Sequence, residues 1–369
     1  WSDLPLSLED IERIEVVRGP NTAAYGANAF QGIINIRTRH AADSAGLYAQ
    51  ARVGERHIRD GVLRYGAADS RLAWRVTAAR DGDSGFAVDD HRTGQVTGRM
   101  DLRPTPNDHF MIQMGGLQGT RGEGEYADLD NGPRPRDVTA HFLQARWERK
   151  LGPEHDVQLQ FFHNFRRQVE RYISSVDLGL FGLVDFPLDY AVRSHRYDLE
   201  AQHRFRIGPA SRMVWGANLR RDTVDAPEFF DGEVAFELAR AFANLEWQPV
   251  ERLTANVGAM LEHNDFTGGD FSPRVALAYE IRRGHTLRAI YSEATRVPSV
   301  LEERANQTAC LDPPACSIVF PVVIGSRDLE PERIVSRELG YFGQPTANLS
   351  LDAKLYRNTL NELTSLLGG

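Results

Sequence analysis

Two cysteines, Cys310 and Cys316, are the residues of this 369-residue chain whose type and spacing point most directly to chemistry. Five residues, LDPPA, stand between them. A pair so close in sequence can form a local disulfide, bind a metal ion as two thiolates, or stay as free thiols. A metal site would need further ligands, and no nearby histidine or cysteine has the spacing to supply them.

A second candidate site is a segment rich in oxygen ligands. Its side-chain oxygens belong to Glu123, Glu125, Asp128, Asp130 and Asn131. Such oxygens are the ligands that calcium prefers, but their spacing departs from the twelve-residue loop of the helix-loop-helix calcium site. The spacing favours a solvated acidic loop, with a calcium site as the alternative.

The sequence contains no recognisable catalytic motif. The eleven histidines are scattered, without the HExxH pattern of zinc hydrolases. There is no GxSxG nucleophile segment, P-loop or convincing dinucleotide fingerprint. We therefore predict that the protein is not an enzyme, has no intrinsic cofactor and binds no catalytic metal.

The elements that carry these residues alternate in polarity with a period of two. In residues 196–207 the outward set includes Leu199 and Phe205, whereas the other face is entirely polar. A soluble β-sandwich could not bury that polar face. About fifteen segments share this pattern, many near the ten residues that a tilted strand needs to cross a bilayer. The clearest examples are 156–166, 196–207, 253–262 and 349–356.

The links between these segments fall into two classes, as in an up-and-down membrane barrel with periplasmic turns and extracellular loops. The short links, expected to be periplasmic, are 69–70, 105–108, 152–154, 208–211, 249–252, 283–284 and 345–346. The long links, expected to be extracellular, are 82–92, 119–136, 169–190, 224–234, 264–269 and 296–332. The pattern predicts an all-β transmembrane barrel.

A different pattern precedes the barrel, in IERIEVVRGPNTAAYGANAFQGIINIRTR (11–39). The capping-box sequence of residues 7–10 suits a brief helical turn. The runs 11–17 and 33–36 are expected to be strands. Between them, Gly19 and Pro20 favour a tight reversal, because glycine accepts backbone angles closed to other residues and proline fixes its own φ.

This stretch resembles the end of the plug domain of TonB-dependent outer-membrane receptors, in which an IEVxRGP strand leads through a YG segment into a GxINI strand. Three later segments resemble the barrel signatures of the same family: SPRVALAYEI (272–281), YSEATRVPSVLEE (291–303) and DLEPERIVSRELGYF (328–342). The plug motif consists of Arg18, Gly19, Pro20, Tyr25, Gly26, Gly32 and Asn35.

The resemblance implies a domain division and a fold. Residues 1–40 would be the C-terminal part of a small α+β plug, and 41–369 an incomplete barrel. The family barrel has about 22 antiparallel strands around a plugged lumen, of which we expect about fifteen here. We also expect the segment that contacts TonB and several closing strands to be missing.

The resemblance also suggests roles for particular residues. In the family, barrel glutamates meet plug arginines, so we match Glu293 and Glu338 to those acids and Arg18 to one arginine, with solvated lumen charges as the alternative. Outer-membrane loops mature in an oxidising compartment, which favours a disulfide between Cys310 and Cys316.

Ligand capture is expected at the lumen mouth, where aromatic rings and arginines from the long loops converge. Cation-π and charge contacts there would suit anionic, aromatic ferric siderophores, although packing between loops would explain the same residues. The candidates are Arg121, Tyr126, Arg134, Phe181, Tyr190, Phe229 and Phe230.

The resemblance thus implies a receptor in the outer membrane of a Gram-negative bacterium. It would import a scarce ligand, most simply a ferric siderophore, with energy from TonB and its inner-membrane complex. Cobalamin, haem or an oligosaccharide are alternative ligands, and a passive porin-like channel or a signalling receptor are alternative classes. Outer-membrane lipid and lipopolysaccharide would surround it. The net charge of −8 argues against a nucleic-acid partner.

Overall fold

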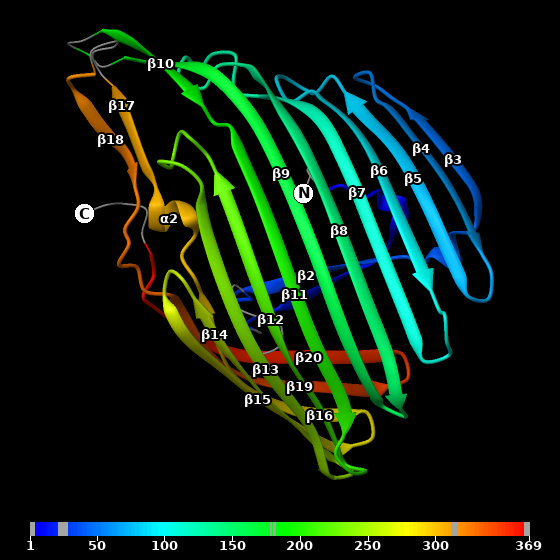
Figure 1. Ribbon diagram of the computed structural model, residues 1–369. Coiled ribbons are helices and arrows are strands. Elements are labelled where there is room, and N and C mark those ends of the chain that lie inside the picture. Colours follow the sequence, from blue (N-terminus) through cyan, green and yellow to red (C-terminus); the bar gives the residue numbers. More distant parts are fainter. Residues whose placement is uncertain (1–3, 21–28, 178, 180–181, 311–315, 365–369) are drawn as a thin grey trace.

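The computed structural model describes residues 4–20, 29–177, 179, 182–310 and 316–364, and these residues are almost entirely β-structure (Figure 1). One large antiparallel sheet dominates, and two small two-stranded sheets accompany it. Within the described residues, no helix combines the length and the apolar character required to cross a membrane.

The large sheet has sixteen strands, fifteen of which follow one another from β20 to β3, while β10 pairs only with the end of β9. This agrees with the predicted number of about fifteen. The strands are β3 (Gly46–Val53), β4 (Arg59–Ala68), β5 (Leu72–Asp83), β6 (His91–Leu102), β7 (Asp108–Glu123), β8 (Arg134–Gly152), β9 (His155–Asp177), β10 (Leu183–Asp189), β11 (Val192–Arg206), β12 (Ser211–Asp225), β13 (Val234–Val250), β14 (Leu253–Asn264), β15 (Gly268–Arg282), β16 (His285–Arg296), β19 (Glu332–Thr346) and β20 (Leu349–Asn361).

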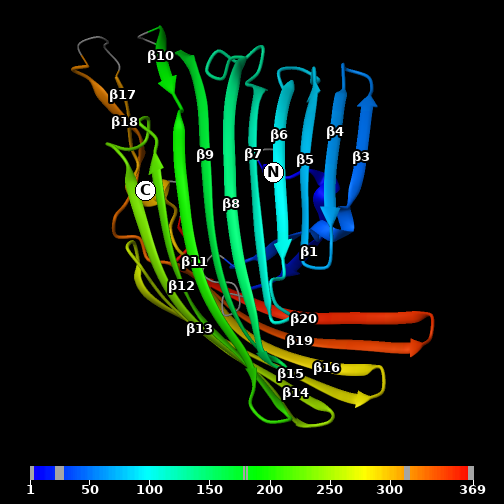
Figure 2. The same cartoon turned by 45° about the vertical axis from the view of Figure 1, so that its right-hand side comes forward.

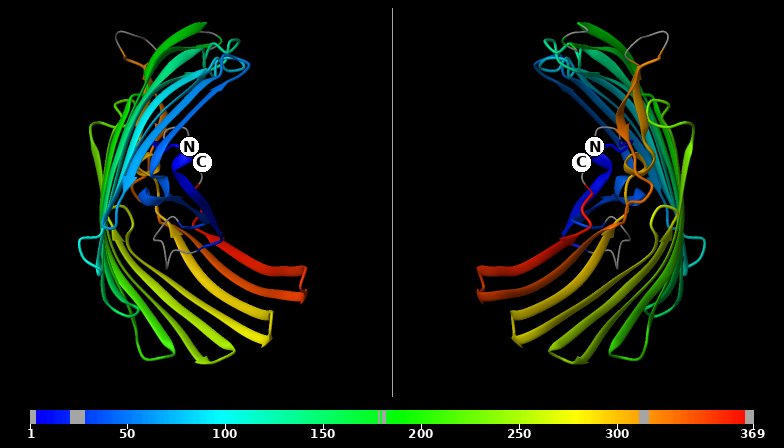
Figure 3. Two further views of the ribbon diagram at one scale, coloured as in Figure 1. Left: turned by 90° about the vertical axis from the view of Figure 1, so that its right-hand side faces the viewer. Right: turned by 90° about the vertical axis from the view of Figure 1, so that its left-hand side faces the viewer.

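The large sheet is strongly curved, with β3 and β20 as its two edges (Figure 2). Viewed along its width, it forms an open trough whose concave side holds the N-terminal segment (Figure 3). The predicted alternation sets the two faces. Polar Asp198 and Asn218 are buried on the concave side, whereas Leu219 and Leu261 are about 60% exposed on the convex side. The convex face is therefore the one suited to lipid.

All seven predicted short links connect consecutive strands, but two predicted long links were wrong. Residues 265–267 form a tight turn, because Asn264 Oδ1 accepts the backbone N–H groups of Phe266 (3.0 Å) and Thr267 (2.9 Å). Most of 169–190 is a hairpin extension, since β9 continues to Asp177 and pairs with β10. Cross-strand side-chain hydrogen bonds stabilise it, including Ser175 Oγ to Asp185 (2.6 Å).

The N-terminal segment contains η1 (Leu8–Asp10), β1 (Ile11–Arg18), β2 (Gly32–Thr38) and η2 (Ala41–Ser44). The helical turn and both strands were predicted, and β1 and β2 pair antiparallel. Gly19 has φ +85°, as the predicted reversal requires. The predicted capping box does not form, because the Ser7 hydroxyl donates to Glu9 Oε2 (2.5 Å) and makes no hydrogen bond to the backbone. Tyr25 and Gly26 lie outside the described residues.

The long link after β16 carries its own elements, α2 (Val300–Arg304), β17 (Asn306–Cys310) and β18 (Val319–Ile324). A capping box begins α2, with Ser299 and Glu302 each accepting the other's backbone N–H. The hairpin β17–β18 lies at the loop end of the sheet, near β10 (Figure 1). The segment is therefore an ordered extracellular element in the topology predicted from the sequence.

Candidate ligand-binding cavity and plug anchor

Asp10 joins the N-terminal segment to the wall of the large sheet. It is completely buried, and its Oδ1 lies 3.2 Å from Arg75 Nε and accepts the Thr77 hydroxyl (3.0 Å). Its Oδ2 accepts the Thr97 hydroxyl (2.8 Å), and Arg64 lies 3.4 Å from Oδ1. Donors from three adjacent strands thus converge on one carboxylate, which satisfies a charge that would otherwise be costly to bury. We call this group the Asp10 anchor.

A second contact lies where β2 leads into η2. Asp101 of β6 accepts the Ala41 backbone N–H (3.0 Å) and both Arg99 Nε (2.8 Å) and Nη2 (2.9 Å). Arg99 also donates to the hydroxyl of Thr38 (2.7 Å). The barrel wall therefore holds the start of the link between the N-terminal segment and β3, at Thr38 and Ala41.

His40 and His109 complete a cluster with Asp101 that has the composition of a metal site. Their Nε2 atoms lie 3.4 Å and 3.2 Å from Asp101 Oδ1. However, His40 Nδ1 accepts the Ala42 backbone N–H, which places the proton of a neutral imidazole on Nε2. Burial lowers the pKa of His40, so the neutral form is favoured. His40 Nε2 makes no hydrogen bond within the described residues although it lies beside Asp101, and Arg99 already neutralises the carboxylate.

The glutamates matched to the family's barrel acids lie in β16 and β19. Glu293 pairs with Arg333 (3.1 Å), and Glu338 lies opposite Tyr356 in the register of β19 and β20. Arg18 ends β1, opposite Gly32. The structure does not bring Arg18 into an ion pair with either glutamate within the described residues, so these assignments stay predictions.

An apolar contact nevertheless joins the same regions. Phe30, which precedes β2, packs with Ala294 of β16 and Ile334 of β19, and all three are at most 5% exposed. Gly32 is required beside it, because a Cβ there would lie 2.7 Å from the Val17 carbonyl oxygen. Of the other motif residues that the structure describes, Gly19 and the buried Pro20 follow β1, and Asn35 Nδ2 donates to Glu15 (2.8 Å).

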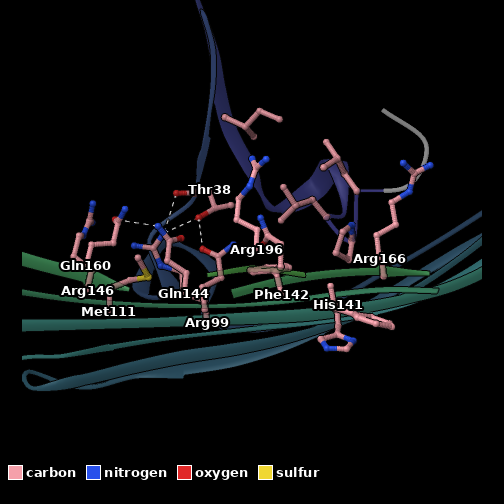
Figure 4. Close-up of a pocket in the computed structure, with 18 of the residues that line it drawn as sticks. Thr38, Arg99, Met111, His141, Phe142, Gln144, Arg146, Gln160, Arg166 and Arg196 are labelled. Atoms are coloured by element: carbon pink, nitrogen blue, oxygen red, sulfur yellow. Dashed lines mark hydrogen bonds between the residues drawn. The ribbon is translucent and has the colours of Figure 1, made fainter. Parts of the chain in front are cut away.

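A cavity of about 1330 Å³ separates the N-terminal segment from the wall formed by β6 to β12. Figure 4 shows Arg99, Arg166 and Arg196 on the side of the strands that faces this segment, whereas His141 extends to the opposite side. Six arginines line the cavity, against the acids Glu12, Glu148 and Asp222: Arg37, Arg99, Arg103, Arg146, Arg166 and Arg196. Arg99, Arg146 and Arg196 are paired with Asp101, Glu148 and Asp222, but the lining still has more guanidinium groups than carboxylates, which suits an anion.

Four of the predicted ligand residues meet at the extracellular end of the sheet. The Arg134 guanidinium lies 3.7 Å from the ring centroid of Tyr172. Tyr172 contacts Tyr190 edge to face (5.9 Å), Tyr190 stacks on Phe229 (5.4 Å), and Phe229 is 6.4 Å from Phe230. We call these five residues the mouth cluster.

Hydrogen bonds between loops hold the mouth cluster in place. The Phe229 carbonyl accepts the Asn306 N–H (2.8 Å), and Glu228 accepts from Gln307 Nε2 (3.1 Å) and the Asp189 N–H (3.3 Å). The β12–β13 link therefore bridges β10 and β17. Arg134 is itself fixed by Glu170, with Arg134 Nη2 2.6 Å from Glu170 Oε1.

The other candidate ligand residues do not join the mouth cluster. Arg121 lines a separate cavity of about 380 Å³, Tyr126 is 77% exposed, and Phe181 lies outside the described residues. The sequence does not single out Tyr172, because the pattern of residues 169–190 predicts a loop, whereas Tyr172 lies in β9. Sequence reasoning also missed the role of Asp10, because as the last residue of the capping-box sequence 7–10 it gave no signal of a contact with the barrel wall.

The acidic segment of the β7–β8 link uses its oxygens on protein donors. Asp128 Oδ1 accepts the backbone N–H groups of Asp130 (3.0 Å) and Asn131 (3.2 Å). Asn131 Oδ1 accepts from Arg134 (2.7 Å), and Glu123 pairs with Arg136 (2.6 Å). Because of these bonds the segment forms a structured turn that supports Arg134. They favour such a turn over a calcium site.

Cys310 and Cys316 form a disulfide that joins the end of β17 to the residues before β18. Closing so short a loop is worth about 2 kcal/mol in the chain-entropy model. We expect reduction by dithiothreitol to speed proteolysis within 305–325. Limited proteolysis followed by mass spectrometry would measure this. In a variant with both cysteines changed to serine, cleavage should be fast with or without reductant; equal rates for reduced and oxidised wild-type protein would contradict the expectation.

Comparisons with known proteins agree with this architecture. The family model described as "TonB dependent receptor-like, beta-barrel" matches residues 73–368, and the model described as "TonB-dependent Receptor Plug Domain" matches residues 2–33. An iron-regulated outer membrane virulence protein of Vibrio cholerae is 22% identical over 379 residues, covering 96% of this chain and 54% of the relative. A vitamin B12 transporter of Vibrio vulnificus is 21% identical, with 98% and 56% covered.

Solved structures show the same fold at low identity. The ferric enterobactin receptor of Pseudomonas aeruginosa superposes with a TM-score of 0.75 at 15% identity, covering 95% of this chain and 58% of that one. A siderophore receptor of Acinetobacter baumannii gives 0.74 at 14%, with 95% and 57% covered. The chain spans about half the length of the curated relatives that it matches.

Proposed function

Because this chain belongs to the TonB-dependent receptor family, we propose that it is part of an active importer whose ligand is an anionic ferric siderophore. The protein belongs to the outer membrane of a Gram-negative bacterium. The proposed division into a plug (1–40) and an incomplete barrel (41–369) follows the change of sheet between β2 and β3. TonB, with its inner-membrane complex, is the proposed energy source.

The observation that carries the proposal is the arginine-rich cavity between the N-terminal segment and the barrel wall. Ferric complexes of catecholates carry net negative charge and present aromatic rings. Guanidinium groups attract such charge, and the mouth cluster offers aromatic faces for stacking. The siderophore receptors named among the similar structures support the same ligand class.

The Asp10 anchor favours active import over a passive pore. A buried carboxylate with four donors from the barrel holds the N-terminal segment inside the concave face. A segment held inside the barrel would block passive diffusion of a ligand. An energised importer, in contrast, needs a segment that closes the barrel and can be moved. The function that we propose is therefore transport, without catalytic activity.

Uptake measurements test this function. Cells that lack their own receptors and express the full-length gene would be given radiolabelled ferric catecholate, ferric hydroxamate, haem or cobalamin, with and without functional TonB. We expect saturable uptake of a ferric chelate that disappears without TonB. Uptake of cobalamin alone would mean that the ligand is cobalamin and not a ferric siderophore, in agreement with the similarity to a vitamin B12 transporter. Unsaturable entry of every compound in both strains would contradict active import.

A further inference from the structure

A carboxyl group is buried in the extracellular link that follows β16. It belongs to Glu303 of α2, whose side chain is 2% exposed. Glu303 Oε2 makes no hydrogen bond in the part of the chain that the structure describes, and Oε1 lies 3.8 Å from Arg304 Nε. An ionised carboxylate at such a place is costly, because it has lost its water without gaining hydrogen bonds in exchange.

The neighbouring acid, Glu302, has the opposite environment. Each of its carboxylate oxygens lies 3.1 Å from a guanidinium nitrogen of Arg296, and Oε2 also accepts the Ser299 backbone N–H (2.7 Å). Burial opposes ionisation, but these bonds prevail and lower the pKa of Glu302. Glu302 is therefore a charged cap of α2, whereas the carboxyl group of Glu303 takes no part in capping.

The charges that face Glu303 do not reverse the effect of burial. Burial raises the pKa of Glu303; Arg304 and Arg327 act against this rise, and Asp328 adds to it. No histidine occurs in residues 297–331. Glu303 therefore favours its neutral form while α2 is packed.

α2 is held both to the barrel wall and to the chain that returns from β18. Before the helix, Val297 packs with Phe236 of β13. After it, the Ala305 carbonyl accepts the Gly325 backbone N–H (2.7 Å). A Cβ at Gly325 would lie 2.8 Å from the backbone carbonyl carbon of Glu303, so the returning chain covers the helix at this residue.

The packing of α2 also bears on the mouth cluster. Asn306, which follows the helix, donates its backbone N–H to the Phe229 carbonyl (2.8 Å) and its Nδ2 to Asp231 (2.9 Å). Both acceptors belong to the β12–β13 link. A shift of α2 would therefore reach Phe229 through the backbone.

We propose that Glu303 is a pH-dependent lock on residues 297–306, which we call the α2 segment: its neutral carboxylic acid permits the packing of α2, and its carboxylate loosens it. The charged form needs water or hydrogen-bond donors that the packed segment does not give it. Ionisation is easier in the detached segment, where Glu303 has its ordinary pKa. Packing is therefore strongest at acid pH and weakens as the pH rises through the raised pKa of packed Glu303.

Hydrogen exchange of the full-length protein in detergent, followed by mass spectrometry, tests the proposal. Protection of the α2 segment, corrected for the intrinsic exchange rate, should fall about tenfold from about pH 5 to about pH 8. Glu303→Gln keeps the shape of the side chain without an ionisable group, so its protection should be equal at both pH values. Asp328→Asn removes an exposed charge that opposes ionisation of Glu303, so the fall should move to lower pH.

Glu330→Gln is the matched control, because Glu330 is an exposed acid of the same link. It should keep the wild-type pH profile. The proposal is overturned if wild-type protection is equal at both pH values, if Glu303→Gln keeps the wild-type profile, if Asp328→Asn does not move the fall, or if Glu330→Gln abolishes it. The wild-type and Asp328→Asn profiles decide the question even if Glu303→Gln does not fold. No transported ligand enters this experiment, so failure of the transport proposal would not affect its result.

Discussion

Replacing Asp10 with alanine should release the N-terminal segment from the barrel wall. The substitution removes the carboxylate that bonds to Arg75 Nε, Thr77 and Thr97 and leaves the Arg75 guanidinium, 2% exposed, without a carboxylate partner, although Arg75 Nη1 still donates to the Arg39 carbonyl. Breaking a buried ion pair by removing one member costs about 3–5 kcal/mol. The contacts of Asp101 with Ala41 and of Arg99 with Thr38 remain, so we expect the plug to be displaced in a measurable fraction of molecules rather than in all of them.

Two measurements would detect that displacement. Cells expressing the Asp10→Ala protein should become sensitive to large antibiotics that the outer membrane normally excludes, and the purified protein should be cleaved faster between residues 4 and 45. Glu15→Ala is the matched control, because Glu15 lies in the same segment but its side chain is 38% exposed and its bonds among the described residues are to Arg13 and Asn35. If the Asp10 and Glu15 variants behave alike, the anchor does not hold the plug.

The second large effect is expected at Arg134. Its side chain is 10% exposed, pairs with Glu170 at 8% exposure, and donates to Asn131 (2.7 Å) and the Gly132 carbonyl (2.9 Å) while covering the Tyr172 ring. Arg134→Ala would leave Glu170 buried without a counter-charge and would free the turn before β8. We expect ligand affinity to fall by roughly 30- to 100-fold, since about 2–3 kcal/mol of preorganisation and direct contact is lost.

Titration of the purified full-length protein with the ferric chelate identified by uptake would measure this loss. Arg171→Ala is the control, because Arg171 is a neighbouring arginine in an exposed pair with Asp189, and exposed pairs contribute little. Tyr190→Ala should show an intermediate loss, because it removes the ring between Tyr172 and Phe229. Unchanged affinity in the Arg134 variant would mean that the mouth cluster only packs loops together.

The mouth cluster and the Asp10 anchor would have different roles in the proposed importer. In the proposed function the mouth cluster would bind the ligand at the extracellular end, and the Asp10 anchor would keep the passage closed beneath it. The cavity between them carries an excess of arginines, which would attract an anion after it leaves the mouth. Each site can be disabled without altering the other, so binding and closure can be measured separately.

Local periodicity in the sequence was sufficient to predict most of the architecture. A strand with one lipid face and one polar face must alternate with period two, so the convex and concave sides of segments such as 196–207 followed without any tertiary information. The short links followed because turn residues are local signals. The reversal at Gly19 followed from the same kind of local constraint on backbone angles. The predicted loop at 169–190 failed because pairing between β9 and β10 depends on their partner strands as well as on local composition.

Only the tertiary structure decided which charged and aromatic side chains meet. Asp10 and Arg75 are far apart in sequence, and their contact depends on how the N-terminal segment enters the trough. The mouth cluster likewise combines side chains from β8, β9 and the β12–β13 link. Periodicity assigns a residue to a face, whereas its partner is determined by register, curvature and loop packing, which are properties of the whole sheet.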